Sequence, residues 1–151
     1  MYSIDNLPII FRSKNIPIPS GYRPLYKLSI ILLILKFCCR GKKSSLLRIQ
    51  LFSWALKSVE SKDRFWEIVT EEINGSIWTL DPTIIRAINF GIGERLLERV
   101  STSVKLTQKG IKLVKDITDN DMMIKEIDFM KQVGFQVTES KITEMSKNWN
   151  T

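Results

Sequence analysis

The chain has 151 residues, of which 44% are hydrophobic and 26% charged, which is the size and composition of about one globular domain. It contains no histidine, which excludes histidine-based triads, histidine general bases and histidine-containing zinc sites. The net charge is +7, and residues 1–60, with ten Lys and Arg against Asp5 and Glu60, carry +8, so the basic excess belongs to the N-terminal part. Such a field attracts nucleic acid, an anionic membrane or an acidic protein, or is simply a solvated basic surface.

Residues 1–23 are predicted to form an extended arm, because Pro8, Pro17 and Pro19 each hold the preceding residue out of the helical region. The arm is rich in apolar side chains, which we expect to dock either on its own domain or on a partner chain. The candidate partner interface consists of these apolar residues and two nearby tyrosines: Leu7, Ile9, Ile10, Phe11, Ile16, Ile18, Tyr22 and Tyr26.

A helix that is apolar on nearly all sides is predicted over residues 24–40, starting at Pro24 and ended by Gly41. Its most apolar stretch, 28–39, has 12 residues and includes Lys36, whereas a membrane span needs roughly 20. Since the first 20 residues also lack a signal-peptide pattern, we expect a cytoplasmic protein. The only cysteines, Cys38 and Cys39, are interpreted as core thiols of a reducing compartment rather than redox or metal-binding groups.

Two further helices are expected before the middle of the chain. Ser44 or Ser45 caps the first, over about 46–58, and the second covers about 61–73. Residues 76–80 read as a short strand. Asp81 and Pro82 then form an N-cap and first turn of a helix over about 82–97, with four apolar residues at helical spacing: Ile85, Ile88, Ile92 and Leu96.

The second half of the chain begins with a predicted hairpin, 98–101 and 103–107, around Thr102. A helix follows over 108–118, and another over 121–133, which Gly134 ends. The residues expected to face inward are Ile111, Val114 and Ile117 on the first of these helices, and Met123, Ile127 and Met130 on the second. Residues 135–151 form a polar tail with room for a short helix at about 142–147.

This order of elements predicts a mainly α winged-helix domain over residues 24–134, in which the hairpin is the wing, preceded by the extended arm and followed by an extra C-terminal helix. The most specific piece is VKLTQKGIKLV, 104–114, which resembles the second wing strand and next helix of many winged-helix proteins. Here Leu106 would enter the core, Thr107 would cap the helix, and Gly110 would let that helix approach the wing closely.

Two groups of residues are candidate nucleic-acid contacts. Arg40, Lys42, Lys43 and Arg48 surround a turn between helices, where the backbone N–H groups of Ser44 and Ser45 could join in binding phosphate. The alternatives for this group are a solvated turn or an acidic protein partner.

The second group lies on the helix before the wing, which enters the major groove in DNA-binding winged helices. Arg86, Asn89 and Arg95 would face outward there and could read bases or contact phosphates. Glu94 and Glu98 would oppose phosphate, which weakens this hypothesis.

Enzymatic motifs are weak. Gly91 and Gly93 begin a dinucleotide-binding pattern, but Leu96 stands at its third glycine, and no phosphate-binding GxxxxGK loop is present. Glu139-Ser-Lys141, after a strand-like run at 135–138, has the E-x-K form of metal-dependent nucleases without a clear upstream acidic partner. We therefore expect a non-catalytic chain with no cofactor and no metal.

A more specific resemblance begins with Arg23-Pro-Leu-Tyr26 and continues through the aliphatic helix to Ser58. Its other features are the Arg40-Gly41 turn with Lys43 and Ser45, and the run Leu51-Phe-Ser-Trp-Ala-Leu56. These features resemble the middle component of ABC-type three-component systems, such as the small subunit of Lamassu-type bacterial defence systems. With the VKLTQKG segment included, the resemblance covers about residues 22–118.

The resemblance implies a non-catalytic adaptor that joins an SMC-like or ABC-type ATPase to an effector such as a nuclease, within an anti-phage or anti-plasmid complex. Direct, non-specific contact with double-stranded DNA is a further expectation, and no membrane is involved. The residues alone also admit a stand-alone winged-helix transcriptional regulator and, with least support, a small enzyme.

Overall fold

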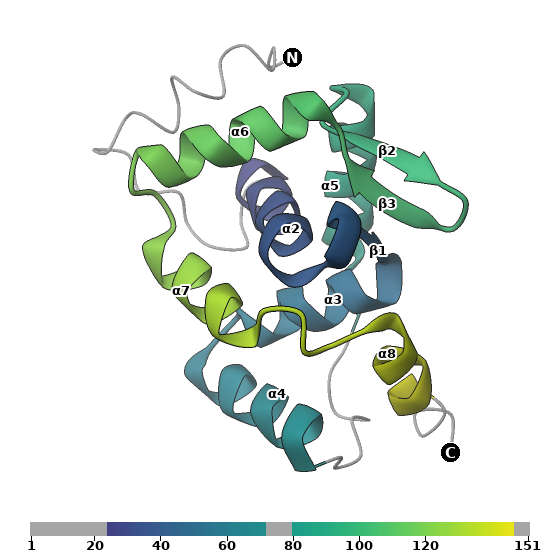
Figure 1. Ribbon diagram of the computed structural model, residues 1–151, viewed down its shortest axis with the longest axis vertical. Helices are drawn as coiled ribbons and strands as arrows, with labels where there is room; N and C mark the ends of the chain where they lie inside the picture. The colour runs from purple at the N-terminus through teal and green to yellow at the C-terminus, as the bar shows by residue number, and fades with distance from the viewer. Residues whose placement is uncertain (1–23, 72–79, 147–151) are drawn as a thin grey trace.

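The computed structural model describes residues 24–71 and 80–146. The predicted arm at 1–23, with Leu7, Ile9, Ile10, Phe11, Ile16, Ile18 and Tyr22, lies outside these residues, as does the strand-like run at 76–80 apart from Leu80. Within them the fold is mainly helical, with a small three-stranded antiparallel sheet at one side (Figure 1).

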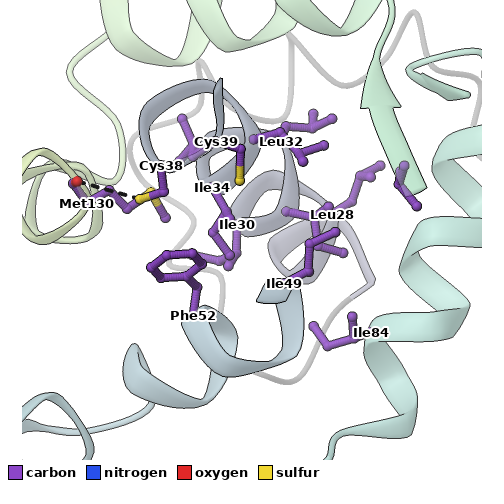
Figure 2. Packing of buried hydrophobic residues seen from close by; sticks show 14 of the residues in the cluster. Leu28, Ile30, Leu32, Ile34, Cys38, Cys39, Ile49, Phe52, Ile84 and Met130 are labelled. Carbon is purple, nitrogen blue, oxygen red and sulfur yellow. Dashed lines mark hydrogen bonds between the residues drawn. The ribbon is translucent and has the colours of Figure 1, made fainter. Parts of the chain in front are cut away.

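Helix α2, Pro24–Cys38, lies at the centre of the molecule (Figure 1). Every side chain from Leu28 to Leu35 is buried, so the prediction of a helix enclosed on nearly all sides is confirmed. Four helices pack around it: α3, Leu46–Ala55; α5, Pro82–Gly93; α6, Gln108–Asp119; and α7, Ile124–Val133. Figure 2 shows this core, with Phe52 and Ile49 of α3 and Ile84 of α5 gathered about α2.

Helix α4, Val59–Glu71, is attached outside this ring and packs on α3. Its Phe65 is fully buried and lies between Phe52 of α3 and Phe129 of α7, with ring centroids 5.7 and 5.6 Å apart. Aromatic rings at this spacing and tilt attract one another beyond the effect of their burial. The last described helix, α8, Glu139–Ser146, follows an irregular segment and contacts α3.

The sheet contains one strand that the sequence did not predict. After α2 the chain makes a 3-10 turn, η2, Arg40–Lys42, and then a three-residue strand, β1, Lys43–Ser45. The predicted hairpin is present as β2, Leu97–Val100, and β3, Ser103–Leu106. β3 lies in the middle of the sheet, so the order is β1-β3-β2, with both pairs antiparallel.

Three predicted helix starts are confirmed by their side-chain caps. The Ser45 hydroxyl accepts from the Arg48 N–H at 3.3 Å, Asp81 accepts from the Thr83 N–H at 2.9 Å, and Thr107 accepts from the Gly110 N–H at 3.1 Å. Gly110 itself is buried and packs against the Leu96 carbonyl, so α6 approaches the start of the β2–β3 hairpin closely, as predicted.

Helix α5 differs from its prediction in length and in orientation. It ends at Gly93, because the Arg95 N–H bonds the Ile92 carbonyl and the Leu96 N–H bonds the Gly91 carbonyl, with Arg95 in the left-handed region at φ 64°. Its buried stripe is Ile84, Ala87, Ile88 and Gly91, so Ile85, predicted to face inward, is 45% exposed. Gly91 lets α5 approach Leu28 of α2 closely, because a Cβ there would overlap the Leu28 side chain. The prediction from isoleucine spacing overlooked the two small residues of this stripe, Ala87 and Gly91.

Other helix ends shift by a few residues. α2 stops at Cys38, before Arg40, and α3 stops at Ala55 rather than near residue 58. α7 begins at Ile124, since Asp121 and Met123 take left-handed backbone angles in the turn before it. Residues 135–138, read as strand-like, form no strand, and α8 starts earlier than predicted. No helix in the described ranges is long and apolar enough to cross a bilayer.

Asp81 connects α5 to the central helix. Its carboxylate accepts from the Lys27 ammonium group of α2 at 2.9 Å, while its backbone exchanges two hydrogen bonds of 2.9 Å with the Gln50 side chain of α3. Burial raises the pKa of Asp81, but hydrogen bonds from Thr83 and Lys27 outweigh burial and lower it to about 2.

Replacing Gly110 by alanine is expected to destabilise the fold, because the new Cβ would overlap the Leu96 carbonyl and the backbone would have to move. We expect a loss of about 2 kcal/mol in the free energy of unfolding, measured by urea denaturation. The matched control is Gly93→Ala, also in a helix but with no atom near the added Cβ, which should be neutral or slightly stabilising. Equal stability of the two variants would contradict the packing of α6 on Leu96.

The Asp81→Asn variant keeps a capping oxygen but removes the charge that Lys27 binds. Because the pKa of Asp81 is lowered in the folded state, its contribution of about 2 kcal/mol should be present at neutral pH and be lost as the pH falls from about 4 to about 2. Urea denaturation of both proteins between these pH values and pH 7 measures it. A stability difference that stays constant with pH would show that the charge is not what matters.

Candidate functional site

A pocket of about 510 Å³ lies where three distant parts of the chain meet. The turn after α2 with β1 and the start of α3 forms one side, the tip of the β2–β3 hairpin another, and the segment leading into α8 the third (Figure 1). Its lining residues are Cys38, Arg40, Lys43, Ser45, Arg48, Thr102, Ser103, Phe135, Thr138 and Glu139. Four of the lining residues are charged and were already noted in the sequence: Arg40, Lys43, Arg48 and Glu139. The sequence did not predict that these three regions of the chain meet.

Arg48 is placed beneath this pocket and not on the surface. The residue is 5% exposed, and its guanidinium donates to the Ser44 hydroxyl at 2.9 Å, the Val137 carbonyl at 3.0 Å and the Lys43 carbonyl at 2.9 Å. Burial therefore separates Arg48 from Arg40, Lys42 and Lys43, with which the sequence groups it as a candidate phosphate contact. Arg48, which belongs to α3, links the C-terminal segment to β1. Its side chain donates to the Val137 carbonyl of the C-terminal segment and to the Lys43 carbonyl of β1.

Glu139 occupies the position at the start of α3 where the sequence predicts a bound phosphate. One of its oxygens accepts from the Ser45 N–H at 2.7 Å and the other from the Ser45 hydroxyl at 2.8 Å. The carboxylate also lies 3.3 Å from the Arg48 guanidinium, and its side chain is 46% exposed. The helix N-terminus therefore already holds an anion, supplied by the chain itself.

The remaining three basic residues of this group stay near solvent. Arg40 is exposed and lies over the Phe135 ring, 5.3 Å from its centroid, while Lys42 is half-buried with φ 56°. Lys43 is exposed on β1 and stands directly opposite Lys105 of β3, which in turn stands opposite Glu98 of β2. Lys105 was missed at the sequence level, because only the pairing of β1 with β3 brings it beside Lys43.

The second candidate group, on α5, does not form a continuous basic surface. Arg86 is exposed at mid-helix, whereas Arg95 lies in the turn after the helix and is held by its backbone, since its carbonyl accepts from the Thr107 hydroxyl. The Asn89 amide oxygen already accepts from Arg99 of β2 at 3.2 Å. Ile85, 45% accessible, is the exposed neighbour of Arg86 on α5, so the exposed part of this helix is both apolar and basic. Leu80, 63% accessible, precedes the helix.

Of the candidate partner interface, only Tyr26 lies in the described part of the chain. It is half-buried, and its hydroxyl donates to Glu126 of α7 at 2.9 Å. Tyr26 also lines a second pocket, of about 300 Å³, next to the Lys27–Asp81 ion pair. This pocket lies at the start of α2, where the predicted arm joins the domain.

The two cysteines are core thiols, as predicted. Both are free and buried, and Cys38 donates to the Met130 carbonyl at 3.5 Å, the dashed contact in Figure 2. Burial raises the pKa of both, that of Cys39 to about 11, which disfavours the reactive thiolate. Among residues 24–71 and 80–146, no group of three or more Cys, Asp and Glu side chains is arranged to hold a metal ion.

Comparison of the chain with protein-family models, with curated proteins and with solved structures finds no match.

The role of Arg48 predicts a large effect of its removal. The Arg48→Met variant would leave the Ser44, Lys43 and Val137 oxygens without their donor and Glu139 without its cation, so we expect a loss of about 3 kcal/mol in the free energy of unfolding.

The control for this variant is Arg86→Met on the exposed face of α5, expected to change stability by less than about 0.5 kcal/mol. Chemical denaturation measures both variants, and limited proteolysis should show earlier cleavage after residue 134 in Arg48→Met. Equal stabilities would contradict the conclusion that Arg48 links the C-terminal segment to β1.

Proposed function

We propose that this chain is a non-catalytic adaptor subunit in the bacterial cytoplasm, which links an SMC-like or ABC-type ATPase to an effector such as a nuclease in an anti-phage or anti-plasmid defence complex. The observation that carries the proposal is the resemblance of residues 22–118 to the middle component of ABC-type three-component systems. The described part of that range, from α2 to α6, belongs to one hydrophobic core, so the resembling residues share a single folded unit.

A winged-helix arrangement of this unit forms part of the proposal. A helix, a short strand and two helices precede α5, which is followed by a two-stranded hairpin and α6. The strand order β1-β3-β2 supports this arrangement, since it places the hairpin as a wing at the edge of a helical core. Helix α4, Val59–Glu71, corresponds to the helix predicted over about residues 61–73.

The resemblance does not by itself identify an interface, since most of its residues are buried. Leu28, Leu51 and Phe52, for example, lie in the core. The surface that remains for partners includes Ile85 on α5, Leu80 before this helix, and the pocket beside Tyr26. Together with the apolar arm, these are the surfaces through which an adaptor would hold two proteins.

The proposal is tested by affinity purification of the tagged full chain from its native host, followed by mass spectrometry. Joint recovery of a coiled-coil ATPase and an effector is the expected result. Recovery of the chain alone, with DNA fragments of one sequence, would overturn the adaptor proposal and favour a stand-alone winged-helix regulator, which should prefer its site by ~10³-fold or more.

Removal of residues 1–20 is expected to abolish recovery of at least one partner while leaving the thermal unfolding midpoint of the remaining chain unchanged, because the arm is proposed to pack on a partner and not on the core. Co-purification and thermal denaturation measure the two effects. The control is removal of residues 147–151 at the other end, which should leave assembly intact. Full assembly of the arm-deleted chain would contradict the role of the arm.

A further inference from the structure

We propose that the outer face of the sheet and the pocket beside it bind the phosphate backbone of double-stranded DNA, and that Glu139 occupies this pocket as an internal competitor of the phosphate. This inference extends the proposed function without depending on it, since an adaptor need not touch DNA. It rests on the charges that β1, β3 and the C-terminal segment bring together.

The first observation is a row of charges across the three strands. Lys43 and Lys105 are direct cross-strand partners, and both are exposed. Like charges in this position repel each other and destabilise the pair. Glu98, opposite Lys105 on β2, offsets only one of the two charges. An external anion over Lys43 and Lys105 would convert this repulsion into attraction.

The second observation is that the same face carries further donors suited to phosphate. Two residues further along β1, on the same face as Lys43, Ser45 is the cross-strand partner of Ser103. Ser103 and its neighbour Thr102, both in the hairpin, line the pocket. Arg40, held over Phe135, adds a cation at the pocket edge. Lysine, arginine and serine or threonine side chains are the groups that contact DNA phosphates and sugars.

The third observation is the position of Glu139. Its carboxylate bonds the Ser45 N–H and hydroxyl, which together would bind a phosphate oxygen in the same way. The buried Arg48 guanidinium lies 3.3 Å from it and keeps the pocket positive from below. Since the Glu139 side chain is 46% exposed, it can leave Ser45 for solvent when a stronger anion enters.

The binding is expected to be independent of base sequence. The surface offers cations and hydroxyls for phosphate, whereas the helix before the hairpin presents Ile85 and an Asn89 amide already bonded to Arg99. Double-stranded DNA fits this surface because it carries one negative charge per about 1.7 Å of its axis, and a row of cations attracts such a dense line of phosphates.

Fluorescence anisotropy of the full chain with two unrelated 20-bp duplexes, over a series of salt concentrations, tests the inference. We expect equal affinity for both duplexes. The double variant Lys43→Glu, Lys105→Glu should bind about tenfold or more weakly at low salt, with the slope of log K against log salt reduced by about 2.

The matched control is Lys115→Glu, Lys125→Glu, two exposed lysines on α6 and α7 whose reversal changes the net charge equally. It should lose less affinity and keep the salt dependence. Equal losses in the two double variants, or no DNA binding by the unmodified chain, would overturn the inference.

The competitor role is tested in the same assay with Glu139→Gln, which keeps the size and an acceptor oxygen of the side chain. This variant should bind DNA several-fold more tightly than Glu144→Gln, which removes one charge elsewhere on the same helix. Circular dichroism checks that both retain their helices. Equal affinities would overturn the role of Glu139. None of these results depends on whether an ATPase is recovered, so this inference and the adaptor proposal fail separately.

Discussion

The burial of α2 is the constraint on which the rest of the structure depends. A helix that is apolar from Leu28 to Leu35 except at Ser29 is stable in water only if other elements cover all its sides. Each buried Leu or Ile contributes about 1.5–3 kcal/mol, and this drives α3, α5, α6 and α7 onto it from four directions. The consequence is that the stretch from Ile31 to Leu35 offers no surface to a partner, so partners must bind around the core.

That periphery is organised by contacts between segments far apart in the chain. Arg48 extends from α3 to the Val137 carbonyl, and Glu139 reaches Ser45, 94 positions away. These bonds place the C-terminal segment beside the hairpin and create a pocket that neither half of the chain contains alone. Because Arg48 is buried while Glu139 is half-exposed, the same cluster combines a fixed cation with an anion that solvent or a ligand can replace.

The parts of the fold that the sequence predicted are those with local signals. Capping by Asp81 and by Thr107 each follows from residues within a few positions of one another. β1 was missed because a three-residue strand with two serines has no apolar pattern, and its pairing partner is about 60 positions away. Arg48 was grouped with the candidate phosphate contacts because no local pattern reveals that the Val137 carbonyl and the Glu139 carboxylate, both from a distant segment, bind its guanidinium. Lys105 was overlooked because only the pairing of β1 with β3 places it beside Lys43.

Hydrogen–deuterium exchange of the full chain, with and without a 20-bp duplex, tests most directly whether the sheet face is the working surface and Glu139 its internal anion. With DNA bound, we expect slower exchange at residues 40–45 and 102–105, faster exchange at 135–142 as Glu139 leaves Ser45, and no change in α5. Slower exchange confined to α5, with the sheet and the C-terminal segment unchanged, would contradict this surface and place DNA on the helix before the hairpin instead.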